Sequence, residues 1–146
     1  MINLTEQQIK EIAEYLDCGM RCYYNKRTGE IKIILNFDSW MVADEEPWKE
    51  DIKEIEENLQ DYVEFEGMES HEVFRVMADF AESIDNSKLR EKLINALNRP
   101  KPFRNFKWQI DNSGESRQVW FDFKNERYIE WVKDQLKAYN WKNDNE

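Results

Sequence analysis

The densest chemical pattern in the chain is a run of alternating basic and aromatic side chains that ends at Trp108. Aromatic rings can stack on the bases of single-stranded nucleic acid while neighbouring cations pair with its phosphates. A helix that begins inside such a run can also hold an anion at its N-terminus. The run therefore suggests a nucleic-acid or phosphorylated-ligand site, for which the candidate residues are Arg99, Lys101, Arg104 and Lys107.

We call the part of this run that holds the cations, Arg99–Lys107, the basic corner. It also has a purely structural interpretation. Phe103 and Phe106 are three residues apart, so both can be buried on one face of a helix. The cations would then face water or pair with the protein's own acidic half. The sequence favours this interpretation, and it leaves open whether the corner binds a foreign ligand or its own domain.

The lone histidine does not make a catalytic site. His71 stands between Ser70 and Glu72. A Ser-His-acid triad needs groups that converge from separate segments, whereas neighbours in the first turn of a helix point in different directions. We therefore expect a surface histidine, no catalytic residue and no enzyme.

Metal and nucleotide sites are not expected either. Cys18 and Cys22 could be soft metal ligands, but zinc prefers four ligands, so we expect two buried or half-buried thiols. The acidic helix could coordinate calcium or carry acid/base chemistry through Glu50, Asp51, Glu54, Glu56, Glu57 and Asp61. It lacks the glycine-containing loop of an EF-hand, and we expect it to be solvated or to dock on a basic partner. The four glycines are scattered, which excludes a P-loop and a dinucleotide fingerprint. We expect no cofactor.

Length and composition indicate a single folded domain, 1–146. The chain is 40% apolar and 14% aromatic, and disordered chains are poor in aromatic residues. No stretch approaches the roughly 18 apolar residues of a membrane helix, and the N-terminus has no charged leader before an apolar run. Because there are only two cysteines, we expect a cytoplasmic protein with reduced thiols.

The net charge of −10 is unevenly distributed. Residues 1–66 carry 17 acids and 7 bases, whereas residues 67–146 carry 14 of each. Overall acidity opposes non-specific nucleic-acid binding, because phosphates are repelled. A local basic face can still bind phosphate.

The first 66 residues predict a helix, a hairpin, an acidic helix and a strand. Thr5 and Gln8 fit a capping box, and Gly19 suits the position after the helix end. Ile34 breaks the alternation of its strand, so it fits a place under a helix or at an edge. The expected strands are 20–25, 31–37 and 62–66. The acidic helix is expected to begin at Asp44–Pro47 and to pack through Trp48, Ile52, Ile55 and Leu59.

The remaining residues predict four helices. Ser70 is expected to cap the first, and Asn86 lies in the cap of the second. The side chains expected in the core are Val73, Phe74, Met77, Phe80, Ala81, Ile84, Leu89, Leu93, Ile94, Leu97, Phe103, Phe106 and Ile110. The last helix, 116–139, has two apolar faces, so the face with Trp120, Phe123 and Trp131 could contact a partner. The order predicts an α+β fold with a small, mostly antiparallel sheet and a mainly C-terminal helical layer.

Over residues 61–131 the chain resembles the bacterial uncharacterised protein family 0158 (UPF). The resemblance rests on SHEVFRVMADFAE, on LREKLINALNRPKPFRNFK and, later, on Trp120, Phe121, Phe123 and Arg127. It implies a packed helical unit and carries no activity with it. The polar positions that packing does not require are Ser70, Glu72, Lys101 and Arg127, and we expect any site among them.

These observations predict a non-enzymatic cytosolic interaction or regulatory protein that can self-associate. The expected partner is another protein or a second copy of the chain. We expect no binding to a membrane. The alternative is binding of nucleic acid or a phosphorylated ligand through the basic corner. A third hypothesis, an enzyme that uses Glu72 with His71, requires a pocket beside them.

Overall fold

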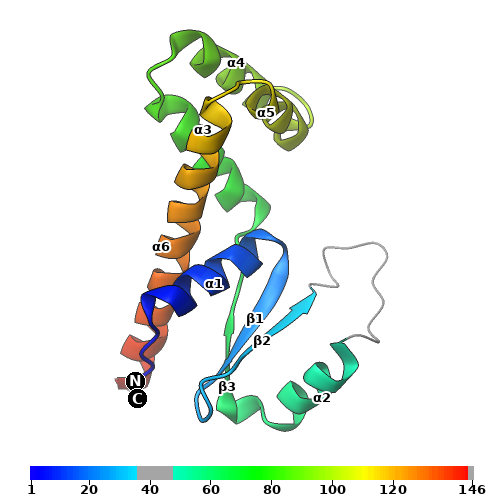
Figure 1. Ribbon diagram of the computed structural model, residues 1–146, viewed down its shortest axis with the longest axis vertical. Helices are drawn as coiled ribbons and strands as arrows, with labels where there is room; N and C mark the ends of the chain where they lie inside the picture. Colours follow the sequence, from blue (N-terminus) through cyan, green and yellow to red (C-terminus); the bar gives the residue numbers. More distant parts are fainter. Residues whose placement is uncertain (36–47, 145–146) are drawn as a thin grey trace. The chain divides into compact units, whose positions relative to one another are not determined.

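The structure is a computed structural model that describes residues 1–35 and 48–144. Its elements follow the order that the sequence predicts, and they form the predicted α+β class (Figure 1). In chain order they are α1 (Glu6–Asp17), β1 (Met20–Asn25), β2 (Ile31–Leu35), α2 (Lys49–Glu57), the 3-10 helix η2 (Leu59–Asp61), β3 (Tyr62–Phe65), α3 (Ser70–Ser83), α4 (Ser87–Leu97), α5 (Pro102–Asp111) and α6 (Ser116–Asp144).

The chain forms two compact units. The sheet unit comprises Met1–Gly67 and Tyr128–Glu146, and the helical unit comprises Met68–Arg127. Helix α6 therefore contributes its first residues to the helical unit and the rest to the sheet unit. Each unit has buried apolar residues of its own. That the chain is a single domain stays a prediction.

The sheet has the strand order β2-β1-β3, and both neighbouring pairs are antiparallel. Cys22 of β1 pairs with Ile33 on one side and with Phe65 on the other, so these side chains share a face. Helix α1 packs on that face, where the buried Cys22 Sγ lies 4.0 Å from the Ile12 carbonyl oxygen. The helix begins with the predicted capping box of Thr5.

Helix α2 packs on the opposite face of the sheet. Ile34 is 5% exposed and packs with Ile55 of α2 and Tyr62 of β3. Both places that the sequence allowed for Ile34 are found, since it lies under α2 and β2 is an edge strand of the sheet. The predicted strand end at Phe37 and the predicted helix start at Asp44–Pro47 lie outside the described residues.

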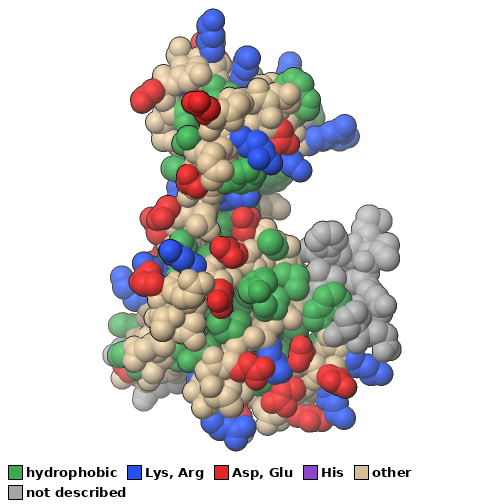
Figure 2. Space-filling model, viewed as in Figure 1, with side chains coloured by type: hydrophobic (Ala, Val, Ile, Leu, Met, Phe, Trp, Pro, Cys, Tyr) green, Lys and Arg blue, Asp and Glu red, His purple; other side chains and the backbone are tan. Residues whose placement is uncertain are grey.

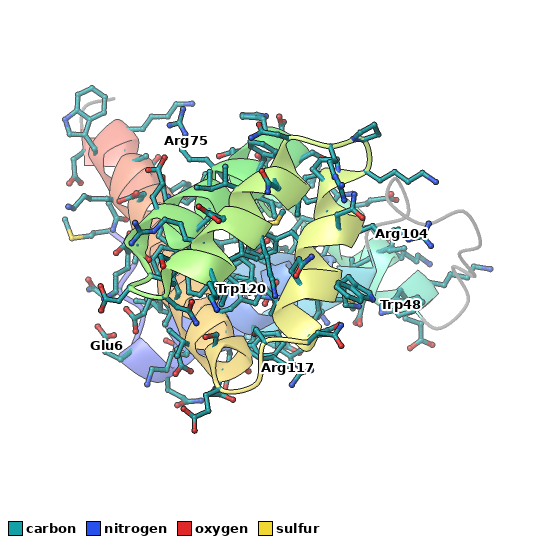
Figure 3. All side chains as sticks on the ribbon, turned by 90° about the horizontal axis from the view of Figure 1, so that it is seen from above. Glu6, Trp48, Arg75, Arg104, Arg117 and Trp120 are labelled. Atoms are coloured by element: carbon teal, nitrogen blue, oxygen red, sulfur yellow. The ribbon has the colours of Figure 1, made fainter. Side chains whose placement is uncertain are left out.

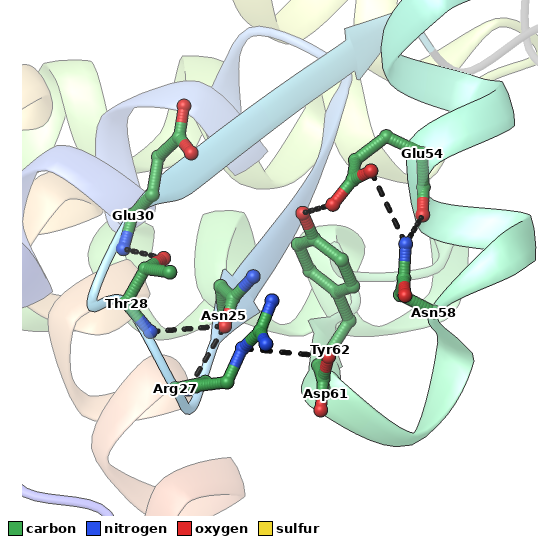
Figure 4. A network of polar contacts seen from close by, with 8 residues as sticks. All are labelled: Asn25, Arg27, Thr28, Glu30, Glu54, Asn58, Asp61 and Tyr62. Carbon is green, nitrogen blue, oxygen red and sulfur yellow. Dashed lines mark hydrogen bonds and ion pairs between the residues drawn. The ribbon is translucent and has the colours of Figure 1, made fainter.

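The hairpin turn fixes how β1 and β2 pair. Asn25 is buried, and its Oδ1 accepts hydrogen bonds from the backbone N–H groups of Arg27 at 2.8 Å and Thr28 at 3.1 Å (Figure 4). Gly29 has a φ of 79°, a conformation that favours glycine. The polar turn predicted between the two strands is therefore confirmed.

The apolar stripe predicted for the acidic helix is too long. Helix α2 ends at Glu57, and Leu59 lies in η2 with 65% of its surface exposed. A 3-10 helix has three residues per turn rather than 3.6, so the residues after α2 leave the buried stripe. Trp48 and Ile52 do pack at the sheet, as predicted.

The helical unit is built around Trp120, which α6 contributes. Its ring meets Phe80 of α3 edge-on at 5.2 Å and Phe106 of α5 edge-on at 4.9 Å. Aromatic pairs in this geometry add about 0.5–1.5 kcal/mol each beyond their burial. Most of the predicted core is confirmed, but Ile94 is 37% exposed because it lies on the outer side of α4, and Val76 is buried without having been predicted.

The second aromatic face of α6 is used inside the units. Trp120 is buried, and the ring of Phe123 lies 5.3 Å from that of Phe80. In the sheet unit, Trp131 Nε1 donates to the Glu66 carbonyl oxygen at 2.7 Å. All three aromatic residues thus make contacts within their own units, while Phe123 and Trp131 are only half-buried. That part of this face contacts a partner stays a prediction.

Candidate ligand-binding surface

A hollow of about 550 Å³ lies on α5 and the turn before it. Three of the four cations of the basic corner border it, whereas the exposed Arg99 does not. The lining residues are Pro100, Lys101, Arg104, Asn105, Lys107, Trp108 and Asp111. We call this feature the α5 hollow.

Helical spacing explains why these residues meet. Arg104, Trp108 and Asp111 follow one another at intervals of four and three residues, so they project from one face of α5. The other face carries Phe106 and Ile110, which are each 1% exposed. Figure 3 shows Arg104 pointing away from α5, while Trp120 lies between the helices. The amphipathic pattern thus exposes the cations because it buries the opposite side.

The prediction that both phenylalanines of the basic corner are buried in the core is confirmed for only one of them. Phe106 is a core residue, as predicted. Phe103 is 40% exposed, so its prediction as a second core anchor was wrong. An exposed aromatic ring therefore accompanies the cations.

The turn before α5 has a constrained backbone. Lys101 has a φ of 58°, and it is the one non-glycine residue with positive φ in the part of the chain that the structure describes. Pro102 follows it at the first helical position, where a missing N–H costs nothing. Asn105 Nδ2 donates to the Pro100 carbonyl oxygen at 2.9 Å and ties the turn to the helix. No side chain caps this helix, so its first backbone N–H groups, which form the positive end of the helix dipole, have no side-chain acceptor.

The charges of the hollow are not neutralised within their unit. In the helical unit, all of whose residues are described, no carboxylate pairs with Lys101, Arg104 or Lys107. Asp111 lines the hollow, but its Oδ1 accepts from Arg117 Nε at 3.2 Å. Figure 2 shows Lys and Arg side chains over α4 and α5, and carboxylates around α2. The hollow therefore presents a positive surface to an anion.

The other predicted site residues lie elsewhere in the helical unit. Ser70 is the exposed first residue of α3, and Glu72 Oε1 accepts from the Glu69 backbone N–H at 3.2 Å. Arg127 pairs with Asp79 at 2.8 Å. None of Ser70, Glu72 and Arg127 lines the α5 hollow, so the structure does not bring them together with Lys101.

The cap of α3 is Glu69 and not Ser70, because the helix already includes Ser70. Glu69 and Glu72 form a reciprocal capping box. His71, 75% exposed, has Nδ1 3.4 Å from Glu69 and Nε2 3.9 Å from Glu72. One ligand atom from each of the three lies within 4.8 Å of the others, but both carboxylates already accept backbone N–H groups. His71 is confirmed as a surface residue.

The two cysteines differ sharply in environment. Cys22 is fully buried, and this burial raises the pKa of its thiol to about 12. Cys18 is exposed at the end of α1, so the prediction of at least half burial was wrong for it. Both are free thiols.

The sequence missed a second hollow, of about 510 Å³, between the sheet and α2. Arg21 and Glu64 meet there at 2.6 Å, and Tyr23 Oη donates to the same carboxylate at 2.7 Å. Burial and then this hydrogen bond raise the pKa of Tyr23 to about 12. The one sequence signal for this hollow was the alternation of polar Arg21 with apolar Cys22 in one strand. The pairing of Tyr23 with Glu64 on another strand could not be predicted from the sequence.

The fold and the α5 hollow define a class: a small α+β protein with a helical unit that carries a positive surface. No helix within residues 1–35 and 48–144 is both long and apolar enough to cross a membrane. The family model of the uncharacterised protein family UPF0158 matches residues 1–145. The chain therefore belongs to this family, and the matched residues extend well beyond the range 61–131 that carries the resemblance.

One curated relative is the UPF0158 protein PA5073 of Pseudomonas aeruginosa, which is 34% identical over 71 residues. The aligned region is 49% of this chain and 42% of the relative, so the chain matches less than half of that protein's length. No solved structure matches the chain.

Proposed function

We propose that this protein is a non-enzymatic binding protein whose α5 hollow holds a phosphate-bearing ligand. The observation that carries the proposal is the convergence of Lys101, Arg104 and Lys107 on one hollow in which no carboxylate of the helical unit pairs with them. Ammonium and guanidinium groups in this arrangement form charge-assisted hydrogen bonds with phosphate oxygens. Binding of nucleic acid or a phosphorylated ligand through the basic corner was the alternative hypothesis that the sequence suggested.

The charge of the two units supports a localised site. The helical unit holds 10 acids and 11 bases, whereas the sheet unit holds 21 acids and 10 bases. A polyanion is therefore repelled by the sheet unit and attracted only where the cations gather. We propose binding rather than catalysis because the lining offers cations, an amide and an indole, and its one carboxylate, Asp111, is held by Arg117. A cytoplasmic location with reduced thiols is part of this proposal.

The experiment is a fluorescence anisotropy titration of a short fluorescein-labelled oligothymidylate, repeated at several salt concentrations, with inorganic polyphosphate as competitor. Three phosphate contacts on a single strand predict a slope of log K against log salt of about −2. The triple variant K101Q/R104Q/K107Q should bind weakly and lose this slope. Equal binding by the triple variant and the wild type would overturn the proposal.

Binding of a protein partner or a second copy stays a prediction. The structure weakens its original motive, because Trp120, Phe123 and Trp131 contact their own units. Light scattering of the purified protein over a range of concentrations measures self-association directly. A mass that rises with concentration would support this second candidate, and a constant monomer mass would count against self-association.

A further inference from the structure

Trp108 is unusual among the tryptophans of the helical unit. Its side chain is 61% exposed at the border of the α5 hollow, whereas Trp120 is 7% exposed in the core. Tryptophan is buried to a high degree on average, and a large exposed ring beside cations serves no packing purpose. Phosphate binding alone would need only the cations. The indole therefore points to a ligand that also has an apolar, planar part.

The backbone holds Trp108 firmly. Its carbonyl oxygen accepts hydrogen bonds from the Asn112 backbone N–H at 3.2 Å and from Asn112 Nδ2 at 2.8 Å. These bonds close the last turn of α5, which is anchored in the core by Phe106 and Ile110. The indole thus projects from a helical turn whose backbone is hydrogen-bonded and whose opposite face is packed in the core.

Arg104 lies one helical turn before Trp108, and Lys107 lies beside it. Side chains one turn apart are roughly 5–6 Å apart at Cβ, so phosphate and ring contacts can be made together by one ligand. Phe103 offers a second exposed ring next to Arg104. Cations interleaved with exposed rings are the arrangement that binds single strands, since every base has a face to stack.

We propose that the ligand of the α5 hollow is single-stranded nucleic acid, with a base stacked on the Trp108 indole and adjacent phosphates on Arg104, Lys107 and Lys101. This inference rests on the proposed function and narrows it. Stacking requires an accessible base face, which a duplex hides inside its own stack and polyphosphate lacks. The hollow therefore prefers single strands with little dependence on sequence.

The experiment compares Trp108→Ala, Trp108→Phe and, as a matched exposed tryptophan of the sheet unit, Trp141→Ala. Each is titrated by anisotropy with labelled oligothymidylate, oligouridylate and a hairpin duplex of equal charge. Trp108→Ala should weaken single-strand binding roughly 5- to 150-fold, the effect of one base–aromatic stack. Trp108→Phe should retain part of the affinity, and Trp141→Ala should leave it unchanged. The slope of log K against log salt should stay the same in all three variants, since no cation is removed.

The outcomes separate the two proposals. If polyphosphate or the duplex competes as well as the single strand, and Trp108→Ala binds like the wild type, stacking is refuted while phosphate binding stands. If none of these ligands binds at low salt, both proposals fail. An equal loss of affinity in Trp108→Ala and Trp141→Ala would also overturn the role of Trp108.

Discussion

Arg117 Nε lies 3.2 Å from Asp111 Oδ1, and this contact occupies the carboxylate that lines the α5 hollow. Asp111 would otherwise place a negative charge beside Lys107 and Trp108. Arg117 also lies 4.7 Å from the ring centroid of Phe121, which helps to fix its position. An arginine outside the hollow therefore helps to set the charge inside it.

The first prediction concerns this ion pair. Arg117→Ala should weaken anion binding about twofold, because it leaves the exposed charge of Asp111 unpaired near the cations, where water and salt screen it. Asp111→Asn should strengthen binding by a similar factor, and the double variant should resemble Asp111→Asn alone. Anisotropy titration of the three variants measures this coupling. If Arg117→Ala weakens binding equally when Asp111→Asn is already present, Arg117 contacts the ligand itself.

The second prediction concerns the backbone at Lys101. Its positive φ is costly for an L-residue, by roughly 1–2 kcal/mol, and costs glycine nothing sterically. Lys101→Gly should therefore be more stable than Lys101→Ala by about 1 kcal/mol, after the entropy of the unfolded chain is counted. Both lose the same charge and should bind phosphate equally poorly. Urea denaturation gives the stability difference. A more stable alanine variant would contradict the turn geometry.

The third prediction separates the two tryptophans of the helical unit. Trp120→Ala removes the ring between Phe80 and Phe106 and should cost about 3–5 kcal/mol of unfolding free energy. Trp108→Ala removes an exposed ring and should change stability by less than about 0.5 kcal/mol. Circular dichroism during urea denaturation measures both. Similar losses in the two variants would mean that Trp108 is part of the core.

The fourth prediction concerns the thiols. In the folded protein iodoacetamide should alkylate Cys18 and spare Cys22, whose thiol is buried and whose pKa is raised from 9.0 to about 12. The protonated thiol is favoured by the fold, so its contribution to stability is complete below pH 9 and is lost as the pH rises towards 12. Mass spectrometry after alkylation, with and without urea, distinguishes the two cysteines. Modification of Cys22 without urea would refute its burial.

Local patterns predicted the elements well. The capping box of Thr5 and Gln8 and the turn at Gly29 depend on neighbours a few residues away, so the sequence contains their full cause. The prediction of Ser70 as the cap of α3 was wrong because two neighbouring residues can each cap this helix. The reciprocal hydrogen bonds between Glu69 and Glu72 select Glu69. The prediction that Leu59 is part of the buried stripe of the acidic helix was also wrong. The change from α2 to the 3-10 helix η2 shifts the helical register at this residue.

The site was only partly predictable because its charges are set by distant partners. Helical spacing brought Arg104 and Lys107 to one hollow, and the turn before α5 adds Lys101, as the basic corner suggested. The sequence could not show that Arg127 is taken by Asp79, 48 residues away. It also gave no sign of the pairing between Arg21 and Glu64, which depends on the register of β1 with β3.

The most direct test of phosphate binding at the α5 hollow is a charge reversal with a matched control. Arg104→Glu and Arg75→Glu make the same change of charge at exposed positions of one unit, but only Arg104 lines the hollow, and Figure 3 shows the two side chains pointing to opposite sides. In anisotropy titrations of labelled oligothymidylate at low salt, Arg104→Glu should bind much more weakly than the wild type, while Arg75→Glu should bind within about twofold of it. Equal affinities for the two variants would contradict the account.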